Sequence, residues 1–257
     1  GVKGAAYATI ISMMGLNVWV IAHFLSSRAV NQLKLDALKL KKEIMKRIFA
    51  IGMAPFSMQL AASFVIGLYT NQLIRHGGDL AVGALGIIFS IANFLVMAMV
   101  AINMASQPII GYNFGAKDYD RVRKTVRIGI IAASIIAVVS TLICEIFPEP
   151  LVRLFNTDDP ELFDLAVNGM RIFALALPVV GFQIVAANFF QSIGKAKVAT
   201  FLSLLRQIIL LAPLLLLLPR FYGLNGVWLA TPLSDFGSAI ITAFFLFWQL
   251  RKLGTEE

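Results

Sequence analysis

Long apolar runs without a charged residue are the feature that most constrains this chain. No Asp, Glu, Lys or Arg occurs between Arg47 and Arg75, or between Asp79 and Lys117. A helix needs about 20 apolar residues to cross the hydrocarbon core of a bilayer, and each of these runs is longer. Over the whole chain only 14% of residues are charged, against about 25% in soluble domains. The sequence therefore predicts a membrane protein.

The apolar runs predict an all-α, polytopic bundle of transmembrane helices with seven spans in this chain. The expected spans are residues 4–25, 48–74, 80–107, 126–146, 162–191, 196–218 and 224–250. At 1.5 Å rise per residue, each is long enough to cross a hydrocarbon core of roughly 30 Å.

The positive charges predict the orientation of these spans. Sixteen of the 22 Lys and Arg residues follow the first, third, fifth and seventh spans, and only four lie on the opposite side. Because cytoplasmic loops of membrane proteins are enriched in Lys and Arg, we expect a multi-pass protein of the cell membrane whose C-terminus is cytoplasmic. The net charge of +8 is then explained by topology and by attraction to the anionic lipid of the bilayer, and no nucleic-acid partner is expected.

The basic segment between the first two spans, residues 28–47, alternates leucines with lysines. This pattern is typical of an amphipathic linker that lies on the inner membrane surface and joins two bundles. A solvated, charged loop would show the same composition, and the sequence leaves both interpretations open.

An internal repeat predicts how the spans are grouped. Residues 1–15 match residues 223–237 at a constant offset of 222. The identities are Gly1 with Gly223, Gly4 with Gly226, Ala8 with Ala230, Thr9 with Thr231, Ser12 with Ser234, and Gly15 with Gly237. Parallel repeats of six helices are a common transporter architecture. We therefore expect residues 1–27 to be the last helix of an N-terminal lobe, residues 48–253 a six-helix C-terminal lobe, and residues 254–257 a cytoplasmic tail. The rest of the N-terminal lobe is an expected partner.

Several motifs, in one order along nearly the whole chain, resemble a known family. They are Gly-Met-Ala-Pro at 52–55, Gln-Pro-Ile-Ile-Gly-Tyr-Asn-Phe-Gly at 107–115, Gln-Ser-Ile-Gly-Lys at 191–195, Leu-Arg-Gln-Ile-Ile-Leu-Leu-Ala-Pro at 205–213, and Gly-Val-Trp-Leu-Ala-Thr-Pro-Leu-Ser-Asp at 226–235. Together they resemble the C-terminal lobe of the multidrug and toxic compound extrusion (MATE) family of efflux transporters.

The resemblance implies a secondary-active exporter that moves lipophilic or cationic small molecules by alternating access between two lobes. It implies antiport against Na⁺ or H⁺, with no other cofactor and no enzymatic activity. Some members hold the coupling cation with acidic side chains on the helices that correspond to residues 48–74 and 162–191. The first of these spans lacks an acid, and so does the second after Asp164, so the chain departs from that pattern.

Two other functions remain as alternatives. A flippase for lipid-linked saccharides, from the same superfamily, would need a more strongly cationic cavity than two intramembrane arginines supply. A membrane-embedded enzyme would need a nucleophile and a base, or a metal cluster, at one depth. The chain has only two histidines, His23 and His76, near opposite membrane faces, and one cysteine, Cys144. We therefore expect neither a catalytic site nor a metal site.

Asp235 is the sharpest candidate for a role in transport. It lies near the middle of its span, where a charge is costly and needs a partner or water. Thr231 and Ser238 share its helical face. Arg206 and Arg171 are the other two charges at membrane depth. Asp235 is therefore expected either to form a structural ion pair with one of these arginines or to handle protons or substrate directly.

Uncharged polar residues and methionines form further stripes at helical spacing. These substrate-pathway candidates are Gln59, Ser63 and Thr70 on one span and Asn93, Met97 and Met104 on the next. Such residues suit a cavity for varied lipophilic cations, because they combine adaptable apolar surface with hydrogen-bonding groups. Ordinary contacts between packed helices would use the same residue types.

Prolines inside the spans are candidates for bending points. Pro55 and Pro178 each remove a backbone donor and are expected to kink their helices. Bending there during transport and a static kink that shapes the lobe are both consistent with the sequence.

Overall fold

The computed structural model describes residues 2–26, 42–156 and 159–254 of the chain. These residues form helices connected by short turns, and no strand occurs among them. The prediction of an all-α fold is therefore confirmed. The chain divides into two compact units, Gly1–Met53 and Ala54–Glu257.

The first unit contains the helix α1 (Val2–Leu25) and the beginning of α2, which starts at Lys42. Residues 6–25 of α1 are long and apolar enough to cross a membrane. Most of the predicted linker, residues 28–41, lies outside the described residues, and residues 42–47 continue as helix. The remainder of the predicted cytoplasmic tail beyond Gly254 also lies outside them.

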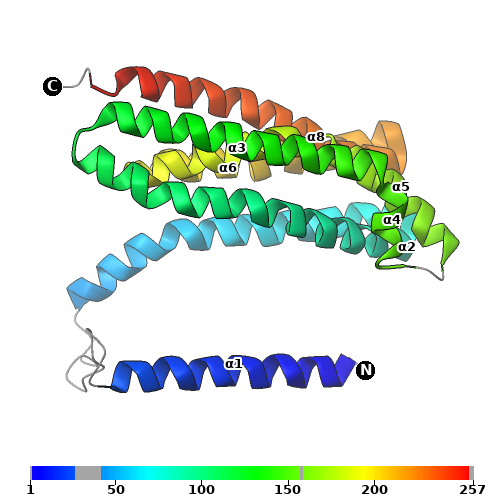
Figure 1. Ribbon diagram of the computed structural model, residues 1–257. Coiled ribbons are helices and arrows are strands. Elements are labelled where there is room, and N and C mark those ends of the chain that lie inside the picture. The colour runs from blue at the N-terminus through cyan, green and yellow to red at the C-terminus, as the bar shows by residue number, and fades with distance from the viewer. Residues whose placement is uncertain (1, 27–41, 157–158, 255–257) are drawn as a thin grey trace. The chain divides into compact units, whose positions relative to one another are not determined.

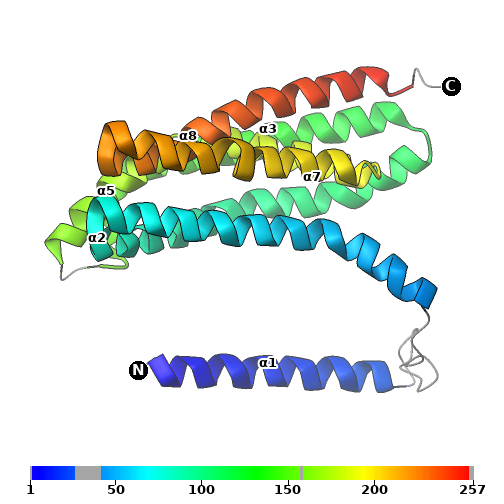
Figure 2. The ribbon, with the colours of Figure 1, turned by 180° about the vertical axis from the view of Figure 1, so that it is seen from behind.

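Two long helices in the second unit are interrupted by a glycine in a non-helical conformation. α2 (Lys42–Gly115) is broken at Gly78, where φ is 67° and ψ is −167°. α8 (Ala212–Lys252) is broken at Gly223, where φ is 54° and ψ is −134°. Positive φ is strained for residues with a Cβ atom, and glycine adopts it readily. In Figures 1 and 2 the ribbons of both helices double back within the second unit, so each supplies two antiparallel arms.

The segment between these two helices has clear start and stop signals. α3 (Tyr119–Ile146) begins where the Asp118 side chain accepts a hydrogen bond from the backbone N–H of Arg121, and it ends before α4 (Pro148–Arg153). α5 (Pro160–Ala174) is capped by Asp159, which accepts from two backbone N–H groups. Carboxylates at helix N-termini stabilise the exposed amides and the helix dipole.

The span expected at residues 162–191 is broken into two helices. α5 and α6 (Leu177–Ser192) meet at an angle of 52°. Pro178 lies in the first turn of α6, where its missing N–H leaves no hydrogen bond unmade. The predicted kink next to Pro178 is therefore confirmed. Pro55 lies within α2, on the first arm.

The last part of the chain contains an unusual helical segment. α7 (Ala196–Leu204) continues into η2, a π-helix at Leu205–Leu211, and then into α8. Pro213 lies two residues after the end of η2. The ring of a proline clashes with the carbonyl group four residues earlier in an α-helix. The wider turn of η2 lies at that point. π-helical turns are rare and are found mostly at functional sites.

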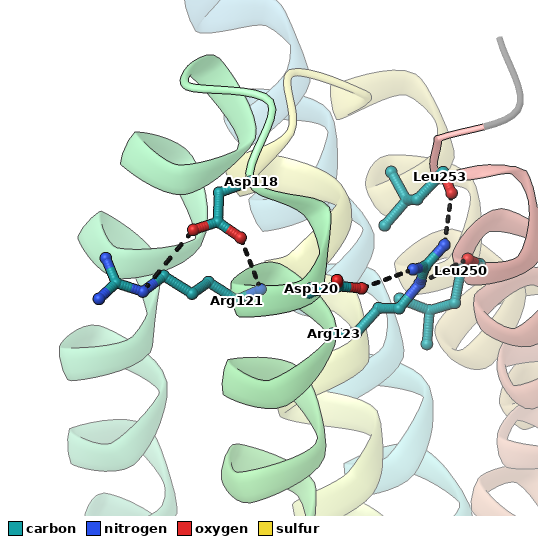
Figure 3. Close-up of polar contacts among 6 residues, drawn as sticks. All are labelled: Asp118, Asp120, Arg121, Arg123, Leu250 and Leu253. Carbon is teal, nitrogen blue, oxygen red and sulfur yellow. Dashed lines mark hydrogen bonds and ion pairs between the residues drawn. The ribbon is translucent and has the colours of Figure 1, made fainter.

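The end of α8 is tied to the beginning of α3, as Figure 3 shows. Arg123 donates from Nη2 to the carbonyl oxygen of Leu253 and from Nε to that of Leu250, and it pairs with Asp120 at 3.0 Å. An arginine at a helix C-terminus satisfies carbonyl groups that have no partner within the helix. This contact joins the two helix ends on the side where we expect the cytoplasm.

Within the second unit, α3 packs against α6, and α8 packs against η2, α6 and α5. Two apolar clusters form the core. One surrounds Trp228, Leu73 and Met170, and the other surrounds Phe189, Val122 and Leu246. Cys144 is buried in the first cluster. Among the described residues, four helical segments are long and apolar enough to cross a membrane, and the bent pair of α5 and α6 makes five.

Candidate substrate and ion site

Arg206 and Asp235 form an ion pair inside the second unit. Arg206 lies on η2 and Asp235 on the second arm of α8. The Nε atom of Arg206 is 2.6 Å from Oδ1 of Asp235, and Nη2 is 3.4 Å from Oδ2. The aspartate side chain is 2% exposed, whereas the arginine side chain is 36% exposed. Of the two partners that the sequence allowed for Asp235, the structure therefore selects Arg206.

The ion pair is held by hydrogen bonds to its backbone. Gln183 on α6 donates from Nε2 to the carbonyl oxygen of Asp235 at 2.7 Å. Ser234 donates from its hydroxyl to the carbonyl oxygen of Arg206 at 2.8 Å. A carbonyl oxygen has two lone pairs, so it can accept a side-chain hydrogen bond in addition to one from its own helix. α6, η2 and α8 are therefore joined at the depth of the charges.

A second polar contact joins the first arm of α2 to α8. Tyr69 donates from its hydroxyl to the carbonyl oxygen of Val227 at 3.2 Å, and Thr231 donates to the Tyr69 hydroxyl at 3.4 Å. Both side chains are buried. Thr231, Asp235 and Ser238 are all buried on one face of α8, which confirms that the predicted stripe points into the bundle.

Two cavities lie on either side of the Arg206 side chain. The larger, about 260 Å³, has aromatic walls formed by Tyr69, Phe89 and Phe173, and it also contains Gln207. The smaller, about 170 Å³, has several polar residues in its wall beside Arg206. Its lining includes Gln183, Ser203, Ser238 and Thr242. Arg206 lines both cavities, whereas Asp235 lines neither.

Each cavity contains a buried amide oxygen without a hydrogen-bond partner in the described part of the chain. These atoms are Oε1 of Gln207 in the larger cavity and Oε1 of Gln183 in the smaller one. Buried acceptors are nearly always hydrogen-bonded in proteins, because leaving one unpaired costs about 1–3 kcal/mol. These two oxygens are therefore suited to accept a hydrogen bond from water or from a bound molecule.

The other polar stripe candidates lie at the surface of the second unit. The Gln59, Ser63, Asn93, Met97 and Met104 side chains are exposed, and Thr70 is half-buried. The structure does not bring them together with the Arg206–Asp235 pair. On α3, by contrast, exposed side chains in the middle of the helix are apolar, as at Ile131 and Ile135. The exposed surface of the unit thus has polar and apolar parts.

Arg171 is separate from the ion pair. It lies in the last turn of α5 with an exposed side chain, and Asp235 pairs with Arg206 instead. Among the described residues, no group of three or more His, Cys, Asp or Glu residues lies close enough to hold a metal ion.

Sequence reasoning missed Tyr69, Gln207 and the π-helix. A tyrosine in the middle of an apolar span was a usable signal, because its hydroxyl needs a partner when it is buried. Pro213, seven residues after Arg206, was a usable signal for irregular helix geometry. The cavities had no signal in the sequence, since each depends on how residues from four helical elements pack.

Comparison with known proteins agrees with this architecture. The sequence profile of the MatE family matches residues 50–217. The chain is 27% identical over 226 residues to the multidrug export protein MepA of Staphylococcus aureus strain MSSA476, covering 88% of this chain and 49% of that protein. It is 26% identical over 256 residues to MepA of Staphylococcus haemolyticus strain JCSC1435, covering 56% of that protein.

Solved structures give the same result. The MATE multidrug transporter DinF-BH, determined in complex with a ligand, is 39% identical and superposes with a TM-score of 0.80 over 96% of this chain and 55% of that one. An inward-facing MATE family transporter of the MOP superfamily is 18% identical, with a TM-score of 0.87 over 99% of this chain and 59% of that one. The outward-facing form of a MATE family transporter gives a TM-score of 0.83 at 20% identity, over 99% of this chain and 57% of that one.

The membrane-length helices, the broken helices and these matches together point to one family of polytopic membrane proteins. The chain belongs to the MatE family of multidrug efflux transporters. It spans about half the length of the curated relatives it matches.

Proposed function

We propose that this chain is the C-terminal lobe, with the last helix of the N-terminal lobe, of a secondary-active multidrug exporter. Its relatives are named as multidrug export proteins, and related structures are described as outward-facing and inward-facing. Alternating access between two lobes, coupled to Na⁺ or H⁺ entry, is the mechanism that we infer for this chain.

The observation that carries the proposal is the contrast between polar and apolar exposed surfaces. Exposed Ile131 and Ile135 on α3 suit contact with lipid. Exposed Gln59, Ser63 and Asn93 on α2 do not, because polar groups in a hydrocarbon environment are unfavourable unless they face protein or water. We therefore assign the polar stripes of α2 to a substrate pathway between this lobe and an N-terminal lobe.

The proposal includes seven membrane spans. The interruptions at Gly78 and Gly223 support it, since they divide the helical segments Phe56–Gly115 and Ala196–Lys252, of 60 and 57 residues, into two arms each. Single-cysteine labelling tests both the number of spans and the orientation. In a background in which Cys144 and any other cysteine of the native protein are replaced by serine, a cysteine at Lys124 should react with a membrane-impermeant thiol reagent only after the cells are opened, whereas one at Arg153 should react in intact cells. The opposite pattern would refute a cytoplasmic C-terminus.

Export is tested with the retention of a fluorescent lipophilic cation, a rhodamine dye, in cells that lack their own efflux pumps and express the native gene. Asn93→Trp should block efflux by filling the pathway. Ile135→Trp is the matched control, because the same bulk is added to an apolar face. Loss of export in both variants, or in neither, would contradict the assignment of the pathway. Absence of export by the unaltered protein, shown to be present in the membrane, would overturn the proposed function.

Coupling is tested separately in vesicles. An imposed proton gradient or an imposed sodium gradient should drive transport of the rhodamine dye, and comparison of the two identifies the ion. The described transmembrane part of this lobe contains one buried carboxylate, Asp235, and it is already paired with an arginine. We therefore expect Asp235→Asn to reduce export by altering Arg206 and the cavity beside it, while coupling to the ion persists. Loss of coupling in this variant would show that Asp235 carries the ion.

A further inference from the structure

The cavity of about 260 Å³ combines aromatic walls with one accessible charge. The ring centroids of Tyr69 and Phe89 lie 6.2 Å apart, and those of Phe89 and Phe173 lie 6.0 Å apart with the rings edge to face. Such surfaces accept a further ring in a stacked or edge-on position. The volume is small for a ligand pocket, so it fits a small aromatic group.

The charge that a bound molecule would meet is positive. Arg206 lines the cavity with 36% of its side chain exposed, whereas Asp235 is 2% exposed and is not part of the wall. The contacts with Asp235 use Nε and Nη2, which are two of the five N–H donors of the guanidinium. The ion pair is therefore oriented with its positive end toward the cavity.

Among the described residues that line the cavity, no acid faces this charge from the other sides. The remaining lining residues of the cavity come from α2, α5, η2 and α8, and all of them are uncharged. Aromatic faces do attract cations, but that attraction is weaker than the repulsion between two like charges in contact within a poorly solvated site. A cationic ligand is therefore disfavoured here.

We propose that this cavity binds aromatic compounds that carry a carboxylate, with the ring packed against Phe89 and Phe173 and the carboxylate on the Arg206 guanidinium. Carboxylates pair with guanidinium groups through two parallel hydrogen bonds, which gives both affinity and orientation. The inference rests on the proposed export function, since such compounds would be cargo, and it departs from the cationic substrates that the family resemblance implies.

Binding is measured apart from transport, on the protein expressed from its native gene and reconstituted in lipid nanodiscs. The probes are 2-naphthoate, the neutral 2-naphthamide and the cation 2-naphthylmethylammonium, which share one ring system and differ in charge. Calorimetric titration, with partitioning into empty nanodiscs subtracted, gives the saturable component for each. We expect 2-naphthoate to bind about tenfold or more tightly than the cation, the size of one charge-assisted hydrogen bond. Equal or tighter binding of the cation overturns the proposal.

Three variants locate the site. Arg206→Gln should remove the preference for 2-naphthoate over 2-naphthamide. Asp235→Asn should bind 2-naphthoate several-fold more tightly, because the buried carboxylate no longer competes for the guanidinium. A purely structural ion pair would not give this increase. Arg171→Gln is the matched control, since it removes an exposed arginine that does not line the cavity, and it should leave all three affinities unchanged.

A fourth variant keeps the proposal testable if either change to the ion pair prevents folding. Leu211→Trp fills the cavity without altering a charge, and it should abolish saturable binding of 2-naphthoate. Unchanged binding in this variant would place the ligand elsewhere and refute the site. Failure of export with intact 2-naphthoate selectivity would count against the proposed function alone.

Discussion

Gly181→Ala should destabilise the protein by separating α3 from α6. A Cβ atom added at Gly181 would lie 2.6 Å from the carbonyl oxygen of Ala133, 2.9 Å from its carbonyl carbon and 3.2 Å from Cβ of Ala137. Packed atoms normally lie about 3.5–4.0 Å apart, so the two helices would have to move apart by roughly 1 Å. A backbone carbonyl group cannot rotate out of the way as a side chain can.

The expected loss is the balance of two terms. Overpacking a buried contact costs about 1–3 kcal/mol, and a backbone clash belongs at the upper end of that range. Replacing glycine with alanine in a helix returns up to about 1 kcal/mol. The net loss of roughly 2 kcal/mol corresponds to a decrease in Tm of about 4–8 °C for a chain of this size.

The single cysteine provides the assay. The side chain of Cys144 is 2% exposed within the core around Trp228, so a thiol-reactive fluorescent dye should label it only on unfolding. Fluorescence during heating then reports Tm for the purified protein. Subtracting the signal of a Cys144→Ser protein in the same assay isolates the contribution of this thiol.

Gly237→Ala is the matched control. Its added Cβ would meet only Cδ1 of Leu210, at the ordinary contact distance of 3.4 Å. We expect Tm to stay the same or to rise by a few degrees, since the propensity gain is not offset by a clash. If Gly181→Ala and Gly237→Ala have equal Tm values, close packing of α3 on α6 is not the reason for a glycine at position 181.

Three further predictions use the same assay. Arg206→Leu should lower the free energy of unfolding by about 3 kcal/mol, because it leaves Asp235 buried without its partner. Adding Asp235→Leu should restore most of that loss. A double variant whose loss equals the sum of the two single losses would refute this prediction. Arg123→Ala should lower the free energy of unfolding by about 1 kcal/mol, because its hydrogen bonds to the end of α8 are lost. Arg121→Ala is the control. It removes only the exposed ion pair with Asp118 at 3.7 Å and should change the free energy of unfolding by less than about 0.5 kcal/mol. Gly226→Ala should lower Tm more than any other glycine change, because its Cβ would clash with the backbone carbonyl group of Leu218, and a wild-type Tm in this variant would contradict the close approach of the two arms of α8 there.

The helical fold was determined largely by the sequence. A chain in hydrocarbon must satisfy its backbone hydrogen bonds within each segment, so long apolar runs leave helices as the only choice for a chain without barrel periodicity. Because the motifs that resemble the MATE family lie in or beside these apolar runs, the same argument predicts that they lie on helices or at helix ends. It also predicted that Asp235 needs a partner, because a lone charge at that depth is costly.

Local sequence also marked several breaks. Pro178 lies at the start of α6, directly after the bend with α5, where proline fits because that helix position has no hydrogen bond to lose. Gly223, the first residue of the repeated motif, takes the positive φ of the interruption in α8. The span expected over residues 162–191 is divided by this bend into α5 and α6.

Only the tertiary structure decided which charges meet and which polar residues are buried. Arg206 and Arg171 are equivalent by sequence, yet the packing of η2 against α8 brings one of them to Asp235 and leaves the other exposed. Helical periodicity predicts which residues share a face, but it does not say whether that face turns toward its own lobe. Thr231 and Asn93 therefore looked alike in sequence and differ in the fold, where Thr231 is buried against Tyr69 and Asn93 is exposed. The cause is that burial and pairing depend on contacts between residues far apart in the chain, which no local pattern contains.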